Sequence, residues 1–470
     1  MSLIKTTSIR SLREIILDYN CNKIACVKIL KVQQFNMFST SSDLKTSSQT
    51  KTIDYQSYLN TVGKLRKPSL IREMTKMLAT APPGTIFMAG GLPNPALFPF
   101  QSLTVELDSK TKLNLDQTAL RAALQYQPTS GYPPLHAELK KLVQHFFNPP
   151  KMSDSELIVT VGSQNALCSV LEMILEPGDA VVVPMPVYSS VLSLMDPHRP
   201  QYLGVPEDAD GMQPHLLKEV LNNWKGKTPK LLYVNPTGSN PSGVVIPSER
   251  KRQIYEIARQ HNLLILEDDP YYFLHFLDKD PETFLSLDVD GRVLRFDSFS
   301  KVLSSGLRVG FATGPKELIR VLELSLQASV LHASSLSQVL VHGILKSWGI
   351  HGFVNHTTKV KQFYKRRRDL MVASVEKHLK GLAEWNLPQG GMFLWMRMLH
   401  VEDTYEMVME RGIGEKIMLL PGREFMARRE DHCPYLRAAF SVIPEDEMDE
   451  GMERLKALIK REEGLQRRKQ

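Results

Sequence analysis

The chain has 470 residues, of which 42% are hydrophobic and 23% charged, a composition typical of a globular protein long enough for two domains. Residues 1–80 hold 13 Lys or Arg and 5 Asp or Glu, so they carry +8 and the remaining chain carries −1 of the total +7. This near-neutral body argues against a nucleic-acid partner. No apolar stretch reaches the roughly 18 residues that span a membrane, so we expect no membrane partner.

The four cysteines, Cys21, Cys26, Cys168 and Cys433, are too few and too scattered for a disulfide framework. No C-x-x-C pair indicates a zinc or redox centre, so we expect no metal site and a reducing compartment. Cys168 lies in the apolar stretch ALCSVLEMIL, where a small buried side chain is expected rather than a nucleophile.

Residues 1–52 form a basic extension, rich in Ser, Thr and Lys, that differs from the rest of the chain. Its segment SIRSLREIILDYN is typical of a mitochondrial presequence, although Glu14 and Asp18 count against this because such peptides are poor in acids. The tract STSSDLKTSSQTK is typical of a disordered tail. Three interpretations of residues 1–52 remain: a mitochondrial targeting segment, a disordered tail on a cytoplasmic protein, and an extension upstream of a true start at Met37.

Residues 53–80 are predicted to form an N-terminal arm that includes a first helix. From 81 to 355, short apolar runs alternate with helical patterns, which is typical of a parallel sheet covered by helices, an α/β fold. The predicted strands are ELIVTV (156–161), AVVVP (180–184), KLLYV (230–234), LLILE (263–267), VLRF (293–296) and VGFAT (309–313). From 356 to 465, a long charged helix, a strand and a last helix predict a second, smaller α+β domain.

Polar side chains follow most of these strands, at the edge where the loops of a parallel α/β sheet bind ligands. After the first strand, Gly162, Ser163 and Gln164 lie at a predicted helix start, where free backbone N–H groups favour a phosphate. The other strands are followed by Tyr188, by Asn240, by Asp268 and Asp269 with Tyr271 and Tyr272, and by Ser298 with Lys301 and Arg308.

Each of these residues alone has an ordinary explanation: a solvated lysine, a turn asparagine, a core aromatic or a helix-capping acid. Their joint occurrence is more informative, because few ligands need an amine, a carboxylate, phenols, an amide and a phosphate site together. Pyridoxal phosphate does, since it requires a lysine for a Schiff base, an acid at its pyridine nitrogen, donors at its phenolate oxygen and an aromatic face.

The sequence resembles the class I/II aminotransferases, the aspartate aminotransferase-like family of fold type I, through SNPSG, DDPYY and SFSK followed by Arg308, in that order. The resemblance covers about residues 55 to 460 and implies pyridoxal 5'-phosphate as cofactor and a large α/β domain with a smaller α+β domain. It makes Lys301 the catalytic Schiff-base lysine and proton carrier. Asp269 would pair with the pyridinium nitrogen, and Tyr272 and Asn240 would hold the phenolate oxygen.

The same resemblance implies the remaining contacts. Tyr188 would lie over the ring, and the phosphate would be bound by Ser163, Gln164, Ser298 and Arg308. Tyr126 would reach the phosphate of the neighbouring subunit in a homodimer, whose active sites would then lie at the subunit interface. The substrate-binding residues would be Arg72, Gly90, Tyr126, Asn240, Phe393 and Arg437. Of these, Arg437 would bind the α-carboxylate, which suits a guanidinium fork.

Within the family, the chain is similar to the kynurenine/2-aminoadipate aminotransferases through SLIREM (69–74), FMAGGLPNPALFPF (87–100), EDDPYYFL (267–274) and GLAEWNLPQGGMFLW (381–395). This similarity implies ping-pong transfer of the amino group of L-kynurenine and/or L-2-aminoadipate to 2-oxoglutarate, as in lysine and tryptophan degradation. Other readings stay open: a broad-specificity transferase for aromatic or large amino acids, β-elimination or decarboxylation on the same scaffold, and a non-catalytic regulator.

Overall fold

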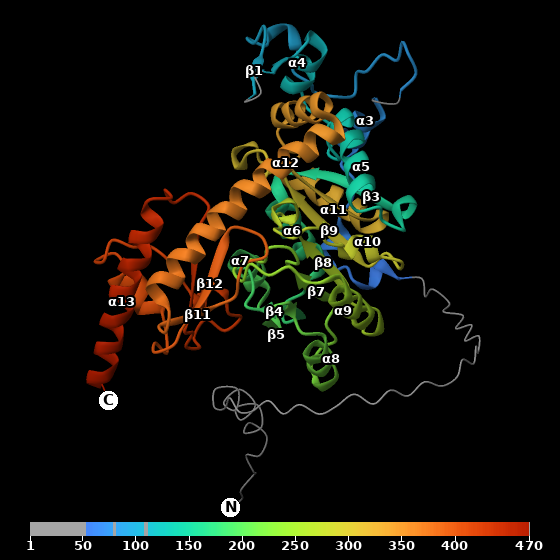
Figure 1. The fold of residues 1–470 in the computed structure, drawn as a ribbon. Coiled ribbons are helices and arrows are strands. Elements are labelled where there is room, and N and C mark those ends of the chain that lie inside the picture. Colours follow the sequence, from blue (N-terminus) through green and yellow to red (C-terminus); the bar gives the residue numbers. More distant parts are fainter. Residues whose placement is uncertain (1–52, 79–80, 108–110, 470) are drawn as a thin grey trace, which may run out of the picture. The chain divides into compact units, whose positions relative to one another are not determined.

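The computed structural model describes residues 53–78, 81–107 and 111–469, which Figure 1 draws in colour. Residues 1–52 lie outside the described residues, and with them every prediction made for the N-terminal extension. In the part of the chain that the structure describes, no helix is both long and apolar enough to cross a membrane.

The centre of the fold is an eight-stranded sheet with the order β3-β10-β9-β8-β7-β4-β5-β6 (Figure 1). Its strands are β3 (Ser155–Thr160), β4 (Ala180–Met185), β5 (Gln201–Asp208), β6 (Gly211–Met212), β7 (Leu231–Val234), β8 (Leu264–Asp268), β9 (Val293–Ser298) and β10 (Gly310–Pro315). The β9-β8-β7-β4-β5 pairs are parallel, whereas β10 is antiparallel to both β9 and β3, and β6 is antiparallel to β5. The predicted α/β fold with a mostly parallel sheet is therefore confirmed.

Helices cover both faces of this sheet, because its strands are apolar on both sides. On one face, α6 (Gly162–Ile174), α7 (Ser189–Met195) and α11 (Lys316–Ser329) pack on residues such as Leu266 and Phe296. On the other face, the packed helices are α5 (Pro133–Phe146), α8 (Pro214–Asn223), α9 (Ser248–Gln260), α10 (Phe284–Leu287) and part of α12 (Ser335–Leu379). Two separate cores result, one on each side of the sheet.

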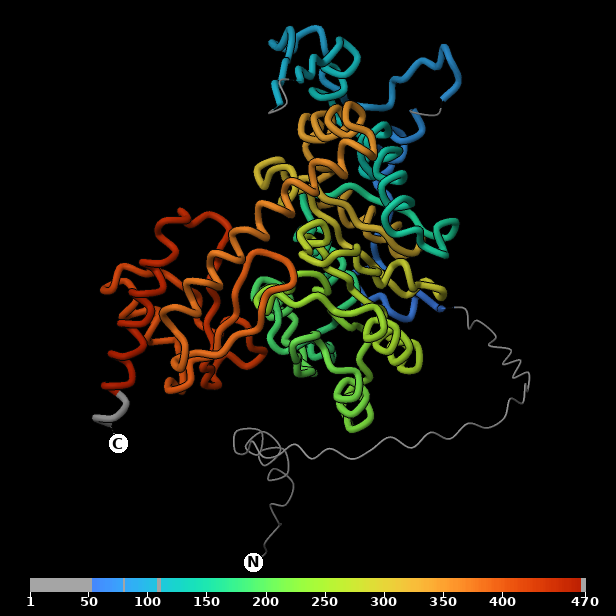
Figure 2. Tube along the Cα trace, in the orientation of Figure 1, coloured from blue at the N-terminus to red at the C-terminus, as the bar shows by residue number. Residues whose placement is uncertain are grey.

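A second sheet lies in the C-terminal part of the chain, which is orange to red in Figure 2. Its order is β11-β12-β14-β13, with β11 (Ala383–Trp385), β12 (Phe393–Met398), β13 (Leu420–Pro421) and β14 (Tyr435–Ala439). A third core joins this sheet to the second half of α12 and to α13 (Glu447–Lys469). The first half of α12 packs in a core of the large sheet, so this helix links the two parts.

The helical geometry of α12 is interrupted at Gly349, whose φ is 58° and ψ −174°. The predicted boundary between residues 355 and 356 falls inside the same helix, a few residues beyond the interruption. Contacts join residues 51–470 into one compact unit, so the division at 355 stays a prediction.

The N-terminal part of the described chain holds α2 (Thr61–Leu65), α3 (Leu70–Leu78), a small hairpin of β1 (Thr104–Glu106) and β2 (Lys112–Asn114), and α4 (Gln117–Leu124). The predicted arm is anchored to the large sheet's helices by Asn60, whose amide donates to the carbonyl oxygens of Glu172 and Leu175.

Candidate active site

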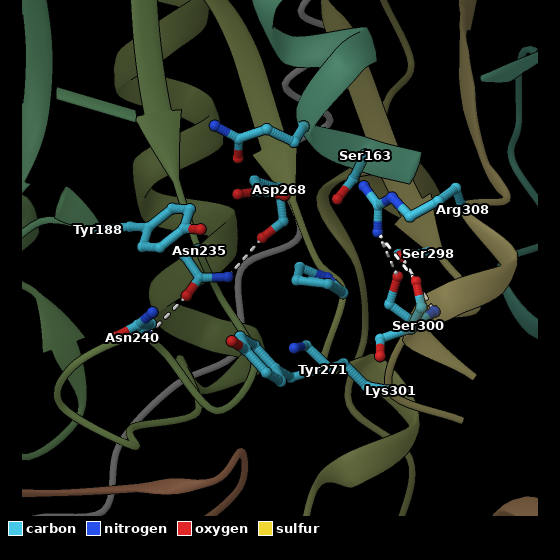
Figure 3. Close-up of a pocket in the computed structure, with 13 residues that line it drawn as sticks. Ser163, Tyr188, Asn235, Asn240, Asp268, Tyr271, Ser298, Ser300, Lys301 and Arg308 are labelled. Carbon is cyan, nitrogen blue, oxygen red and sulfur yellow. Dashed lines mark hydrogen bonds between the residues drawn. The ribbon is translucent and has the colours of Figure 1, made fainter. Parts of the chain in front are cut away.

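A cavity of about 290 Å³ opens at the carboxyl edge of the large sheet (Figure 3). Loops that follow β3, β4, β7, β8 and β9 line it, together with the segment that leads into β10. The lining residues are Ser163, Gln164, Tyr188, Asn235, Asn240, Asp268, Pro270, Tyr271, Ser298, Ser300, Lys301, Ser305 and Arg308. The structure thus brings together most of the cofactor residues predicted from the sequence.

One side of the cavity combines the N-terminus of α6 with the Arg308 guanidinium (Figure 3). Arg308 donates to Ser300 Oγ at 3.4 Å and to the carbonyl oxygen of Val161 at 3.3 Å. The Arg308 guanidinium packs closely against Gly162, since a Cβ at this glycine would lie 2.7 Å from Arg308 Nη2. Free N–H groups, serine hydroxyls and a guanidinium together form a site suited to a phosphate.

Lys301 extends into the cavity from the loop after β9 and is half-buried. Its Nζ lies 6.0 Å from the centroid of the Tyr271 ring. Burial, followed by the positive charges of Arg308 and Arg437, lowers the pKa of Lys301 below its ordinary value. A lowered pKa increases the fraction of neutral amine, the form that attacks a carbonyl or accepts a proton.

Asp268 ends β8, and one oxygen of its buried carboxylate remains available. Oδ2 accepts a hydrogen bond from the Tyr233 hydroxyl at 2.9 Å, whereas the buried Oδ1 has no hydrogen-bond partner among the described residues. Burial raises the pKa of Asp268 to about 7. A buried oxygen without a partner is costly, so this site is suited to a ligand that brings an N–H group or a positive charge.

Asn235 and Asn240 form a hydrogen-bonded chain that crosses the cavity floor (Figure 3). Asn235 donates from its amide to the Asp268 carbonyl oxygen at 2.6 Å and accepts from the Asn240 backbone N–H at 2.7 Å. The sequence interpretation missed Asn235, although its position directly after β7 repeats the pattern of the other cavity residues. Pro270, Ser300 and Ser305 also line the cavity and were not predicted.

The structure corrects two predicted site residues by one position. The cavity is lined by Asp268 and Tyr271, not by Asp269 and Tyr272. Asp269 is turned away, where its Oδ2 accepts from Arg295 at 3.0 Å and from Thr237 at 3.1 Å. Tyr272 packs edge-on against Phe147 with ring centroids 5.0 Å apart. For the two acids the reason is alternation at the end of β8, because adjacent side chains of a strand point to opposite sides, whereas Tyr272 begins a short 3-10 helix after the turn that carries Tyr271.

Arg437 lies on β14, yet it contacts the loop after β7. Its Nη1 donates to Asn240 Oδ1 at 2.7 Å, and its guanidinium carbon lies 4.1 Å from the centroid of the Phe393 ring. Its Nε is buried and has no partner among the described residues. Burial lowers the pKa of Arg437, which remains a cation suited to a carboxylate.

Of the predicted substrate residues, Asn240 lines the cavity of this chain and Arg437 contacts Asn240 beside it, whereas the other four do not line it. Arg72 is buried against Thr129 and the Gln127 carbonyl oxygen. Gly90 is partly buried, and a Cβ there would meet the Phe87 ring at 2.6 Å. Tyr126 is 47% exposed, with its ring edge-on to His332 at 5.9 Å. Phe393 is buried against Tyr271, beside the cavity but not among its lining residues.

The residues present fit pyridoxal phosphate, and the unpartnered Oδ1 of Asp268 is the observation that tests this. It would hold the proton on the ring nitrogen, opposite the phosphate site of Ser163, Ser298 and Arg308. Asn240 and Tyr271 would donate to the phenolate oxygen.

Residues 99–455 match the family model described as aminotransferase class I and II. The mitochondrial kynurenine/alpha-aminoadipate aminotransferase of Bos taurus is 42% identical over 422 residues, which cover 87% of this chain and 99% of the relative. A kynurenine aminotransferase from Pyrococcus horikoshii, solved in complex with PMP, is similar with a TM-score of 0.69 and 31% identity, covering 87% of this chain and 98% of that one. Aminotransferase Aro8 from Candida albicans has a TM-score of 0.79 at 28% identity, covering 88% and 99%. With this match and this cavity, the chain belongs to the class I and II aminotransferases, the PLP-dependent enzymes of fold type I.

Proposed function

We propose that the protein binds pyridoxal 5'-phosphate in this cavity and moves the amino group of L-kynurenine and/or L-2-aminoadipate to 2-oxoglutarate by a ping-pong mechanism. The observation that carries the proposal is that the Lys301 amine and Asp268, with its unpartnered Oδ1, line one cavity, while the Arg437 guanidinium bonds Asn240 at its edge. The names of the relatives support the substrate class.

When bound, pyridoxal phosphate supplies an aldehyde for amines and a ring that accepts the electron pair released at the substrate Cα. Lys301, with its lowered pKa, is proposed as the base that takes the Cα proton and returns it on the cofactor side. The unpartnered Oδ1 of Asp268 would accept from the ring nitrogen and so favour its protonated form. Tyr188 would lie against the ring, and Ser163, Gln164, Ser298, Ser300 and Arg308 would hold the phosphate.

Arg437 is proposed to bind the substrate α-carboxylate. Its hydrogen bond to Asn240 holds the guanidinium beside the cavity, and its unpartnered Nε can donate to one carboxylate oxygen. A carboxylate at Arg437 would leave the α-amino group facing Lys301. The roles predicted for Asp269 and Tyr272 pass to Asp268 and Tyr271.

We also propose a homodimer, in which Arg72, Gly90 and Tyr126 would complete the site of the neighbouring subunit. The orientation of α3 supports this: its polar residue Glu73 faces inward and accepts from Arg320 and Gln327, at 2.9 and 2.7 Å. Its apolar Leu70 and Ile71 are 75% and 63% exposed. A helix with its apolar side toward solvent is typical of an interface with another chain.

A mitochondrial location is the proposal we favour for the compartment. The basic N-terminal extension and the mitochondrial names of the relatives support it, and a cytoplasmic protein is the alternative. Separate large and small domains, divided near residue 355, are likewise proposed, and the separate third core supports them.

The test of the substrate class is a steady-state donor panel with the full chain, pyridoxal phosphate and 2-oxoglutarate. We expect kcat/KM to be highest for L-kynurenine or L-2-aminoadipate, with the parallel double-reciprocal lines of a ping-pong mechanism. If kcat/KM were highest for phenylalanine and tyrosine, the proposed donors would be wrong and the enzyme would be a transferase for aromatic amino acids. If ammonia or carbon dioxide were released and no glutamate were formed from 2-oxoglutarate, the reaction would be an elimination or a decarboxylation, not a transamination.

A further inference from the structure

A buried group of charges lies behind the cavity floor, on the opposite face of the large sheet. At its centre is Arg295 of β9, which pairs with Glu267 of β8 and whose side chain is fully buried. Three carboxylates surround its guanidinium: Glu267 at 3.1 Å, Asp269 at 3.0 Å and Asp297 at 2.9 Å. The Phe147 ring lies 4.0 Å from its guanidinium carbon. Burying a guanidinium and three carboxylates costs desolvation free energy that their attraction offsets only in part. Stability alone therefore gives no reason for this group.

The alternation of side chains places this group directly behind the cavity. Leu266 and Phe296 belong to one core, and the next side chains on their face, Asp268 and Ser298, line the cavity. Glu267, Arg295 and Asp297 project to the other face. Each partner of Arg295 on these two strands is therefore a chain neighbour of a cavity residue.

The hydrogen bonds of Arg295 and its partner Asp269 also connect the three cavity loops that follow β7, β8 and β9. Asp269 begins the loop that carries Tyr271, and Asp297 precedes Ser298 and the loop of Lys301. Asp269 further accepts from Thr237, which lies between Asn235 and Asn240 in the loop after β7. A rigid guanidinium with five donors can hold such a set in one geometry, whereas an ammonium cannot.

We propose that Arg295 is the positioning residue of the cofactor site: from behind the sheet, it holds the loops of Asn240, Asp268 and Lys301 in the arrangement that binds the cofactor. This inference rests on the proposed function of the cavity. It assigns a role to a residue that touches neither cofactor nor substrate.

The same group contributes to the electrostatic field at Asp268. The charges around Asp268 are Asp269 on its own loop and Asp297 and Arg295 on β9, and the Tyr233 hydroxyl from β7 bonds it directly. The hydroxyls of Tyr188 and Tyr271 face it across the cavity. After burial, the two carboxylates raise the pKa of Asp268, whereas Arg295 lowers it. Removing Arg295 and removing one carboxylate should therefore shift this pKa in opposite directions.

The probe is pyridoxamine 5'-phosphate, which has no aldehyde and so binds without a covalent bond to Lys301. Its dissociation constant is measured by equilibrium dialysis against the full-length apoprotein of five chains: wild type, Arg295→Lys, Arg295→Met, Asp297→Asn and a control, Arg292→Lys. Arg292 is also a buried arginine with a carboxylate partner, Asp290, but it lies at the other end of β9, away from the cavity. Circular dichroism establishes that each variant is folded.

For Arg295→Lys we expect about tenfold weaker binding, the effect typical of groups that orient a ligand's own contacts, and none for Arg292→Lys. Binding should weaken as the pH falls through the pKa of Asp268, because a protonated carboxyl no longer accepts from the ring nitrogen. The midpoint of this loss should move to higher pH in Arg295→Met and to lower pH in Asp297→Asn. A role in stability alone would not give shifts of opposite sign.

Equal binding by Arg295→Lys and wild type, or midpoints that move together, would overturn the inference. If Arg295→Met does not fold, Asp297→Asn alone still decides the sign of the shift. The proposed function fails separately, because in that case the wild-type chain itself would not bind pyridoxamine phosphate.

Discussion

Arg437 Nη1 and Asn240 Oδ1 are joined by a 2.7 Å hydrogen bond that links β14 of the second sheet to the loop after β7 of the first. Both residues are placed at the cavity by contacts within the protein, so the carboxylate-binding group is held before substrate arrives. Any shift of the second sheet relative to the large one would move Arg437 relative to Lys301.

Arg437→Lys should raise KM for both the amino acid and the oxo acid. A lysine keeps the charge but loses the fork of donors, and loss of a charged hydrogen bond corresponds to about 10- to 100-fold in affinity. Initial rates with each substrate measure this. Arg397→Lys on the neighbouring strand is the control, since Arg397 pairs with Glu384 and should leave KM unchanged. Equal effects of the two substitutions would contradict the assignment.

Lys301→Ala should lower kcat by about a hundred- to ten-thousandfold or more, because it removes the base that carries the proton. The cofactor should still bind, since its phosphate contacts remain, and it should now be removed by dialysis. Added small primary amines should restore part of the activity. The control, Lys316→Ala at the exposed start of α11, should behave as wild type. Near-normal turnover by Lys301→Ala would exclude its catalytic role.

The apoprotein should lose stability as pH rises through the pKa of Asp268. Burial raises this pKa from 3.8 to about 7 in the folded state, so between these values the folded state binds more protons than the unfolded state. The free energy of unfolding of wild type relative to Asp268→Asn should therefore fall between about pH 4 and 7, by up to the order of 4 kcal/mol. Urea unfolding at a series of pH values measures this difference. An unchanged difference would show that Asp268 titrates at an ordinary pKa.

Gly310→Ala should disrupt the phosphate side of the cavity. Its Cβ would meet the Asp297 carbonyl oxygen at 2.6 Å and the Ser163 backbone nitrogen at 2.8 Å, and neither backbone atom can move freely. We expect a loss of about 1–3 kcal/mol in unfolding free energy, together with weaker cofactor binding. Gly306→Ala in the preceding loop is the control, because its Cβ would meet only Ser304 Oγ at 3.8 Å. Thermal unfolding with and without cofactor compares the two.

Ile71→Glu should shift the protein from dimer to monomer. A charge on the exposed apolar side of α3 would be buried in the proposed interface at a high cost. Analytical ultracentrifugation gives the oligomeric state, and the control is Val289→Glu, since Val289 is exposed at 45% on a different element. A wild-type protein that is monomeric and fully active would contradict both the proposed dimer interface and the proposed role of Tyr126.

Much of the site could be predicted because each strand end carries its own polar residue. Ser163, Tyr188, Asn240, Ser298, Lys301 and Arg308 all line the cavity as expected from these positions. The choice between Asp268 and Asp269 could not be made in this way. The predicted strand LLILE ends at Glu267, whereas β8 continues to Asp268, and one residue reverses the side to which an acid points.

Other features depend on contacts that are distant in the sequence. The apolar run of β10 is the same whether the strand is parallel or antiparallel, so its antiparallel direction could not be read from it. β5 was missed because its half-buried sequence, QYLGVPED, has no continuous apolar run. The inward position of Arg72 follows from contacts with residues 127–129, which lie more than fifty positions away.

The most direct test of the proposed transamination is a single half-reaction. The full chain loaded with pyridoxal phosphate is mixed with excess L-2-aminoadipate or L-kynurenine and no oxo acid, and the 2-oxo acid, or kynurenate formed from it by ring closure, is quantified per active site. The account predicts one equivalent of product from at least one donor, bleaching of the cofactor's visible absorption, and its return on addition of 2-oxoglutarate. No product from either donor, with the absorption unchanged, would contradict it.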